Sequence, residues 1–168
     1  MNQIEFIKTI NPFKNKLFRL AKRLLISNDE AQDACQEILV KLWNKKEELQ
    51  NLKSIEAFAM TLTKNYCLDE LKSKKSNNLR IENYEFENKN NNLEKDLEIS
   101  DSLKWIIKAI DKLPEQQKTI IQLREIEQYE FEEIAEMLQM NQTAIRVALS
   151  RARNTIKDFM TKTDNYGI

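Results

Sequence analysis

The sequence contains one glycine, Gly167, among 168 residues, and this scarcity limits the possible folds and sites more than any other feature. Glycine supplies the positive-φ backbone of tight turns and the close backbone approach of phosphate-binding loops. A phosphate-cradling loop, a Rossmann turn and a nucleophile elbow are therefore excluded. Only two prolines, Pro12 and Pro114, are present. Because proline ends helices, so few prolines predict long helices.

Histidine is absent and cysteine occurs twice, as Cys35 and Cys67. This composition excludes His-based triads and zinc sites with imidazole ligands, and no C-x-x-C spacing could hold a metal. Both cysteines fall in helical patterns and are expected to be reduced, apolar side chains. We expect no metal, no other cofactor and no enzymatic activity. The sequence shows neither a signal peptide nor a run of about 18 apolar residues, which predicts a cytoplasmic protein without membrane insertion.

Apolar residues recur at helical spacing in the N-terminal half, at 17–25, at 31–43 and from 55 onward. Ser27, followed three residues later by Glu30, resembles a capping box before the second stripe. Ser54 is placed to cap the third helix, which carries Ile55, Phe58, Ala59 and Leu62 and is expected to run to about Lys72. Three amphipathic helices are predicted here.

The composition changes between about Ser73 and Glu98, where asparagine, lysine and glutamate dominate. Asparagine competes with the backbone for hydrogen bonds and disfavours helix interiors, so this segment predicts a flexible linker. Helical stripes return at 103–113, 115–123, 131–138 and 145–159, and no strand pattern competes. The predicted fold is all-α, with two small helical domains at 1–75 and 101–163 joined by a linker at 76–100.

The last two stripes have the outline of a helix-turn-helix. A short helix at 131–138 is followed by a turn at 139–141, in which Asn141 is a good N-cap, and by an arginine-rich helix. A plain helical hairpin in a bundle is the alternative. Lys and Arg equal Asp and Glu at 27 each, yet 51–80 and 139–168 each carry a net charge of +3. The basic blocks favour contact with a polyanion, while overall neutrality predicts weak DNA binding by the isolated chain.

Three longer motifs carry a resemblance to a family. LPEQQKTIIQLREIEQYEFEEIAEMLQMNQTAIRVALSRARNTIK covers the C-terminal half, and DEAQDACQEILVKLW and AFAMTLTKNYCLDELKSKK lie in the N-terminal half. Together they resemble regions 4 and 2 of extracytoplasmic-function sigma factors, sigma-70 family proteins of bacterial RNA polymerase. Phe58 stands where the family usually has tryptophan. Gln139 and Met140 occupy a turn where glycine is common, so one of them is expected to need a strained backbone.

The resemblance implies that the helix at 31–43 docks on the β′ clamp helices of core RNA polymerase. Asp33 and Glu37 are i, i+4 neighbours, and Gln36 lies beside them opposite the apolar stripe. From the residues alone, this polar face could equally be a solvated helix surface, and Trp43 could be a core residue. The residues assigned to polymerase binding are Asp33, Gln36, Glu37, Leu42 and Trp43.

The next helix is expected to contact the −10 element of the promoter. Asn65, Asp69 and Lys72 share one helix face, and nearby basic and aromatic side chains, Tyr66 among them, suit capture of an unstacked single strand. The resemblance implies that a flipped −10 base is held near this helix. Asp69 could instead have a structural role, holding Lys72 or a backbone amide. The residues assigned to the −10 element are Phe58, Lys64, Asn65, Asp69, Lys72, Lys74 and Lys75.

The resemblance implies that the final helix reads the −35 element. At 100° per residue, Ile145, Leu149 and Ala152 gather on the side that must pack. The opposite side presents early residues to base edges, and two later arginines flank the apolar stripe, where phosphates are the better partners. The residues assigned to the −35 element are Gln142, Thr143, Arg146, Val147, Ser150, Arg151 and Arg153.

The resemblance implies a sigma factor that recruits core RNA polymerase, through the β′ clamp helices and the β flap, to promoter DNA and helps to open it. An anti-sigma factor is a further candidate partner, and no small-molecule substrate is expected. The alternative is a stand-alone helix-turn-helix regulator with a dimerising N-terminal domain, which would bind its operator without polymerase. A helical carboxylate enzyme is disfavoured because the apolar stripes contain no cluster of Asp or Glu.

Overall fold

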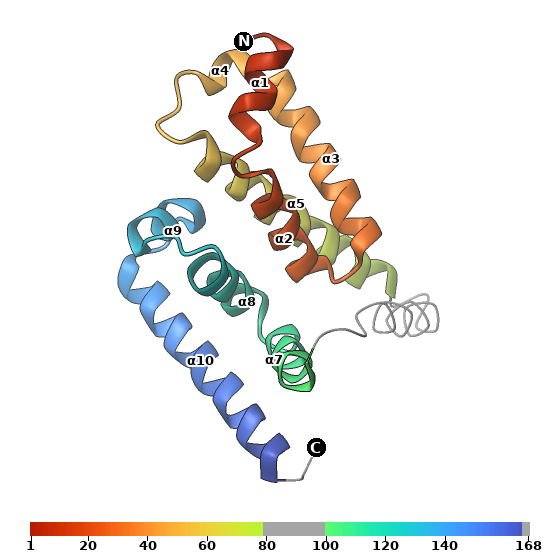
Figure 1. Ribbon diagram of the computed structural model, residues 1–168, viewed down its shortest axis with the longest axis vertical. Coiled ribbons are helices and arrows are strands. Elements are labelled where there is room, and N and C mark those ends of the chain that lie inside the picture. Colours follow the sequence, from red (N-terminus) through yellow and green to blue (C-terminus); the bar gives the residue numbers. More distant parts are fainter. Residues whose placement is uncertain (79–99, 166–168) are drawn as a thin grey trace. The chain divides into compact units, whose positions relative to one another are not determined.

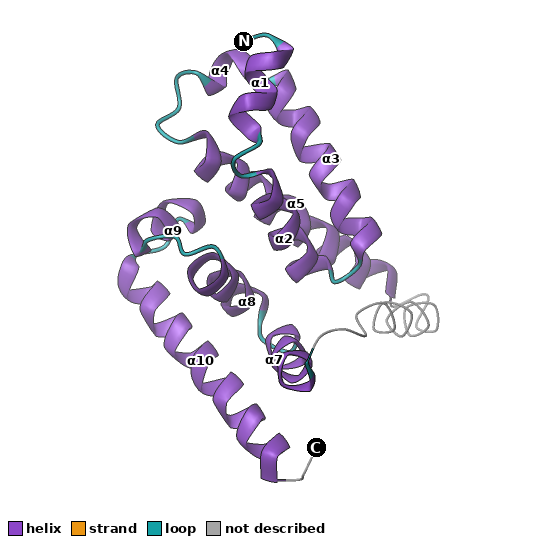
Figure 2. Cartoon of the chain, viewed as in Figure 1, coloured by secondary structure: helices purple, strands orange, loops and turns teal. Residues whose placement is uncertain are grey.

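A computed structural model of the chain describes residues 1–78 and 100–165, with side chains described for 1–75 and 100–162. Every regular element in these ranges is a helix (Figure 2), so the all-α prediction is confirmed. The chain divides into two compact units, Met1–Lys89 and Asn90–Ile168. The predicted linker at 76–100 lies almost wholly outside the described residues. Among the described helices, none is long and apolar enough to span a membrane.

The N-terminal unit is a helical bundle in which α2 packs against both α3 and α5, and α3 also packs against α5. The centre of its core includes Leu17, Leu24 and Ile38, each with no more than 1% exposure. Burying such aliphatic side chains is the main stabilising contribution to a bundle of this size. The helices of this unit are α1 (Gln3–Ile10), α2 (Lys14–Leu25), α3 (Asn28–Asn44), α4 (Lys46–Leu49) and α5 (Ile55–Asn78) (Figure 1).

Side-chain caps start two helices of this unit, α3 and α5, at the predicted places. Ser27 Oγ accepts a hydrogen bond from the Glu30 amide at 3.3 Å, and Ser54 Oγ accepts one from the Ala57 amide at 3.1 Å. Each bond satisfies a backbone N–H that the first helical turn leaves without a partner. The Glu30 carboxylate pairs with Lys74 of α5. The predicted start of α3 is therefore confirmed, with Glu30 linking α3 to α5.

Three features of this unit differ from the sequence-based expectations. The short helices α1 and α4 were not predicted, because each is too short to show a sustained apolar period. Helix α5 continues to Asn78, past the expected end near Lys72. Its most buried face is Ala59, Met60, Thr63 and Cys67, whereas Ile55, Phe58 and Leu62 are half-buried. The small side chains allow α5 to pack closely, and the Thr63 hydroxyl is satisfied by the Ala59 carbonyl at 2.8 Å.

The C-terminal unit is built around the long helix α10, which packs against α7, α8 and α9. Its core contains Ile120, Leu123, Ile134, Ile145 and Leu149, each at most 2% exposed. Pro114 precedes α8, as expected of a residue that suits the start of a helix. The elements of this unit are α7 (Asp101–Asp111), α8 (Glu115–Ile121), the π-helical turn η2 (Gln122–Ile126), α9 (Phe131–Leu138) and α10 (Gln142–Asn165).

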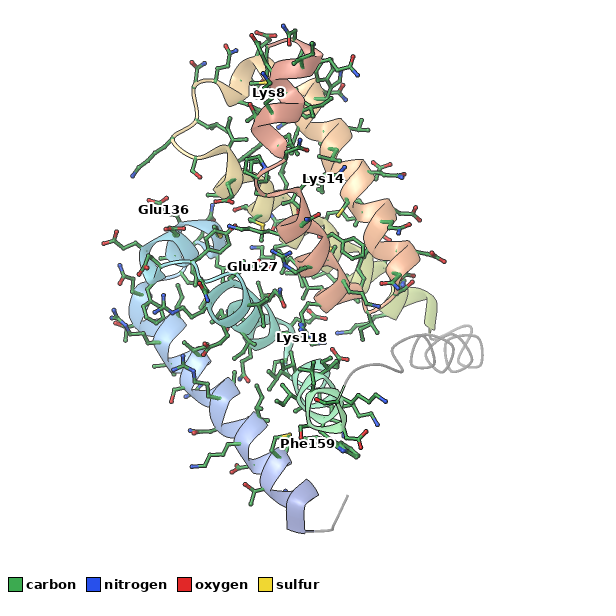
Figure 3. The ribbon with its side chains drawn as sticks, in the orientation of Figure 1. Lys8, Lys14, Lys118, Glu127, Glu136 and Phe159 are labelled. Carbon is green, nitrogen blue, oxygen red and sulfur yellow. The ribbon has the colours of Figure 1, made fainter. Side chains whose placement is uncertain are left out.

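The turn η2 follows α8 directly and was not predicted. Its wider winding is shown by the Glu127 amide, which donates to the Gln122 carbonyl five residues earlier at 3.0 Å. This winding lets the Gln122 amide group donate to the Glu127 carboxylate at 3.0 Å, although both side chains are less than 10% exposed. Figure 3 labels Glu127 at this position. The result is a hydrogen-bonded polar pair in the buried part of this unit.

Candidate functional site

The predicted polar face of α3 is present on the surface of the N-terminal unit. Asp33, Gln36 and Glu37 are exposed, whereas Ala34 and Ile38 on the opposite side of the helix are buried. A buried stripe on one side fixes the rotation of the helix, and the three polar side chains must then project outward. The face carries two carboxylates and an amide, and so suits a basic, hydrogen-bonding partner surface.

The two apolar residues assigned to the same contact lie elsewhere. Leu42 is 0% exposed and belongs to the core of the unit, so its side chain offers no surface to a partner. Trp43 is half-buried, with its ring edge-on to Phe6 of α1 at a centroid distance of 5.1 Å. The Lys46 ammonium lies 3.6 Å from the Trp43 ring centroid. Trp43 therefore packs α1 against α3, in agreement with the core alternative.

Tyr66 of α5 lies on the side that faces α3. The Lys41 ammonium is 5.3 Å from its ring centroid, and the tyrosine lines a small surface pocket together with Asp33 and Glu70. Burial, followed by the negative charges of Glu70 and Glu37, raises the pKa of the Tyr66 phenol. Tyr66 is thus part of the acidic surface next to α3, and not of the α5 face that carries Asn65.

The α5 face assigned to the −10 element is largely open to solvent. Asn65, Asp69 and Lys72, whose spacing places them on one helix face, are all exposed. An asparagine amide offers both a donor and an acceptor to a base edge, and the lysine supplies a positive charge for a phosphate. Lys75, one helical turn beyond Lys72, is exposed as well.

The remaining residues assigned to the −10 element are less available. Phe58 is half-buried, and the Lys45 ammonium lies 5.9 Å from its ring centroid. Lys64 is half-buried, and burial lowers its pKa. Lys74 forms the ion pair with Glu30 described above. The exposed part of the predicted site is therefore the surface formed by Asn65, Asp69, Lys72 and Lys75 on α5.

The helix-turn-helix of the C-terminal unit consists of α9, a tight turn and α10. Gln139 adopts the left-handed conformation, with φ 53° and ψ 47°, in the turn where the family commonly has glycine. The Met140 amide donates to the Ala135 carbonyl at 3.1 Å, which closes the end of α9. Asn141 Oδ1 then accepts from the Ala144 amide at 2.7 Å and caps α10. The expected strained residue and the expected cap are both confirmed.

The outer surface of α10 presents the side chains assigned to base edges. Ile145, Leu149 and Ala152 are buried at 2% exposure or less, so the predicted stripe is the packed side. The residues on the other side are exposed, except for the half-buried Gln142: Thr143, Arg146, Val147 and Ser150. An exposed row along the early turns of the second helix is the arrangement that reads a major groove in helix-turn-helix proteins.

The arginines of α10 have different surroundings. Arg146 is exposed, and its guanidinium carbon lies 4.9 Å from the centroid of the Phe131 ring at the start of α9. Arg151 is exposed. Arg153 forms an ion pair with Glu125 of η2. The sequence assigned Arg151 and Arg153 the same role, phosphate binding. In the structure the two differ, because Arg153 is paired with Glu125.

Two residues that the sequence did not single out lie beside Arg146. Phe131 was assigned only to the apolar stripe of α9, and Arg124 only to a family motif. In the structure the Arg124 guanidinium carbon is 4.3 Å from the same Phe131 ring centroid, and its Nη1 donates to the Tyr129 carbonyl at 2.9 Å. Helical periodicity indicates which side is buried but does not reveal a contact between η2, α9 and α10.

The comparisons with known proteins agree with this two-unit arrangement. Residues 9–77 match Sigma-70 region 2 and residues 103–156 match Sigma-70, region 4. The RNA polymerase sigma factor SigV of Bacillus subtilis (strain 168) is 30% identical over 160 residues, which cover 94% of this chain and 92% of SigV. The chain belongs to the sigma-70 family. It is a sigma factor of the extracytoplasmic-function type and acts in transcription initiation.

Two solved structures share the fold. The sigma factor RpoE of Bartonella quintana, in complex with the anti-sigma factor NepR, matches with a TM-score of 0.76 and 18% identity, over 94% of this chain and 97% of RpoE. CnrH, in complex with the cytosolic domain of CnrY, matches with a TM-score of 0.72 and 19% identity, over 96% of this chain and 90% of CnrH. At these identities the likeness concerns the fold alone.

Proposed function

We propose that the two units of this sigma factor have separate roles, each carried out by exposed helix faces. Region 2, at 1–75, binds core RNA polymerase and melts the −10 element. Region 4, at 101–163, reads the −35 element, and 76–100 links the two regions. The observation that carries the proposal is the exposed surface of α10, where Thr143, Arg146 and Val147 lie opposite a fully buried stripe. Such a helix is free to enter a major groove.

Each surface has a role that follows from its chemistry. Asp33, Gln36 and Glu37 bind the basic β′ clamp helices of core polymerase. Asn65 holds a base of the −10 element, and Asp69 orients the side chains around that base. Lys72 and Lys75 bind phosphates. Phe58, Lys64 and Lys74 make additional contacts with the −10 element at the edge of this surface. Leu42 and Trp43 support the polymerase-binding helix from within. The β flap of core polymerase is the partner of region 4.

On α10, base edges and phosphates are contacted by different residues. Gln142, Thr143, Arg146, Val147 and Ser150 meet the bases, and Arg151 and Arg153 meet the DNA backbone. Phosphate contacts fix the register of the helix, and base contacts select the sequence. Catalysis of RNA synthesis belongs to the polymerase, and the sigma factor acts beside it in the bacterial cytoplasm, at the nucleoid.

A protein inhibitor is a further proposed partner. Both solved structures above are complexes, one with the anti-sigma factor NepR and one with the cytosolic domain of CnrY. We infer that an anti-sigma factor binds this chain as well and holds it inactive.

Run-off transcription tests the proposal, with core polymerase on genomic fragments in the presence and absence of the purified chain. Discrete transcripts are expected only when the chain is added. The double variant Asp33→Lys, Glu37→Lys should lose core binding in a pull-down while the fold is kept, because both side chains are exposed. Asn65→Ala should retain core binding and lose permanganate reactivity of unpaired thymines. A chain that binds its sites equally well without polymerase, and adds no transcripts, would be a stand-alone regulator.

A further inference from the structure

Phe131 lies under two arginines that come from different elements of the C-terminal unit. The guanidinium carbons of Arg124 in η2 and Arg146 in α10 lie 4.3 Å and 4.9 Å from its ring centroid. Both distances are within the range in which a cation is attracted by the face of an aromatic ring. The half-buried ring of Phe131, the first residue of α9, therefore contacts both the π-helical turn η2 and the outer surface of α10.

Arg124 is the fixed member of this group. Its Nη1 donates to the Tyr129 carbonyl at 2.9 Å and lies 3.7 Å from a carboxylate oxygen of Glu130. These contacts hold the Arg124 guanidinium against the chain segment that leads into α9. Because Phe131 directly follows this segment, the fixed Arg124 guanidinium also restricts the position of the Phe131 ring that it contacts.

Arg146 is the free member of this group. Within the described residues, its guanidinium has the Phe131 ring as a neighbour but no hydrogen-bond or ion-pair partner. A ring contact uses the flat face of a guanidinium and leaves the N–H donors at its edge available. Edge donors are the groups that make a bidentate contact with O6 and N7 of guanine.

We propose that Phe131 is a positioning residue that holds Arg146 in the orientation in which it reads a base of the −35 element. This inference rests on the proposed function, in which Arg146 contacts DNA. An arginine side chain has many rotamers, and ordering them on binding costs affinity. A ring that restricts the guanidinium before DNA arrives reduces this cost and favours one base over its competitors.

The test uses holoenzyme assembled from core RNA polymerase and the full chain. The probe is a duplex promoter library in which the −35 segment is randomised, and the enriched sequences give the base preference at each position. Four variants are compared with the unaltered chain: Phe131→Leu, Phe131→Tyr, Arg146→Ala and the double variant Phe131→Leu, Arg146→Ala. Phe159→Leu is the matched control. Phe159, labelled in Figure 3, is also a ring near a cationic side chain of this unit, with the Lys112 ammonium 4.7 Å from its centroid, but it pairs with Trp105 of α7.

Phe131→Leu is expected to weaken base preference about three- to tenfold at the position where Arg146→Ala abolishes it. Phe131→Tyr keeps the ring and should keep the preference, as should Phe159→Leu. The double variant should be no worse than Arg146→Ala, because the two residues act through one contact. The salt dependence of binding should be the same for Phe131→Leu and the unaltered chain, since no charge is removed.

Three outcomes would overturn this inference. Phe131→Leu could leave the preference unchanged while Arg146→Ala alters it, which contradicts the positioning role but leaves the proposed function intact. Phe131→Tyr could lose the preference as fully as Phe131→Leu does, which would make the effect one of packing. If holoenzyme with the unaltered chain enriched no −35 sequence, the proposed function itself would fail.

Discussion

At the scale of residues, long charged side chains decide which part of each predicted surface is available. Lys74 and Arg153 were both assigned to phosphates, and both are paired with carboxylates, those of Glu30 and Glu125. The position of a residue on its helix follows from periodicity. Its partner does not, because a lysine or arginine reaches over a wide area from its backbone. The charge that DNA encounters therefore depends on contacts between elements.

The pair between Arg153 and Glu125 predicts that the acidic residue limits DNA binding. Both side chains are largely exposed, and an exposed ion pair is worth about 0–1 kcal/mol. Glu125→Gln should tighten binding of the full chain to a non-specific duplex by about two- to fivefold at low salt, because Arg153 is then free for a phosphate. Titration followed by fluorescence anisotropy measures this affinity. Glu132→Gln, an exposed residue of α9, makes the same charge change, and an equal gain in both variants would contradict the pairing effect.

The buried cysteines predict a stability that depends on pH. Burial raises the pKa of the Cys35 thiol to about 11 and that of Cys67 to about 12. The unfolded chain would ionise its thiols near pH 9, so the folded state favours the protonated form. The free energy of unfolding should therefore be unaffected by these groups below about pH 9 and fall as the pH rises toward 11–12. The variant Cys35→Ala, Cys67→Ala should show a flatter decline in urea unfolding.

A second measurement examines the same thiols directly. At pH 8 both cysteines are protonated and buried, so a disulfide reagent such as dithiobis-nitrobenzoate should react far more slowly with the folded chain than with the chain in urea. Equal rates in the two states would contradict the burial.

At the scale of elements, the turns show how this chain folds with a single glycine. Ile26, Gln128 and Gln139 have positive φ values of 71°, 62° and 53°. Residues with a Cβ atom occupy this region at a cost that glycine avoids. Backbone bonds hold these turns in place, such as the Ile26 amide to the Lys22 carbonyl at 2.8 Å. Each of these residues lowers the free energy of unfolding, and the packing of the helices on either side of the turn offsets this cost.

Gln139→Gly should therefore stabilise region 4. The left-handed backbone at this position suits glycine, so the free energy of unfolding should rise by up to about 1 kcal/mol. Lys157→Gly is the control, because this exposed residue lies inside α10, where glycine should cost about 1 kcal/mol. Thermal unfolding of the full chain measures both shifts. A decrease for Gln139→Gly would mean that the glutamine side chain contributes more to the turn than its backbone costs.

The same scale shows what the sequence could and could not predict. The buried stripe of α10 and the caps at Ser27, Ser54 and Asn141 follow from local rules, and all are found. The burial of Leu42 also follows from its place in an apolar stripe. The packing of Trp43 on Phe6, the rotation of α5 and the turn η2 depend on how helices meet, which no single stripe contains. The roles of the assigned residues came from family motifs and remain predictions about binding.

At the scale of the whole molecule, electrical neutrality is the property that matters most for function. With 27 positive and 27 negative side chains, the chain gains little from the general attraction that basic proteins have for DNA. Core polymerase must then supply much of the affinity, while the sigma factor supplies the choice of sequence. This division explains why the acidic face of α3 and the basic surface of α10 can occur in one neutral chain.

The most direct test measures DNA binding by the full chain with and without core RNA polymerase. The probes are a promoter duplex found by run-off transcription and a scrambled duplex of equal length, both at physiological salt. The chain alone should bind weakly and without preference, and binding should become tight and favour the promoter once core polymerase is added. Strong, sequence-specific binding by the chain alone, unchanged by core polymerase, would contradict this prediction.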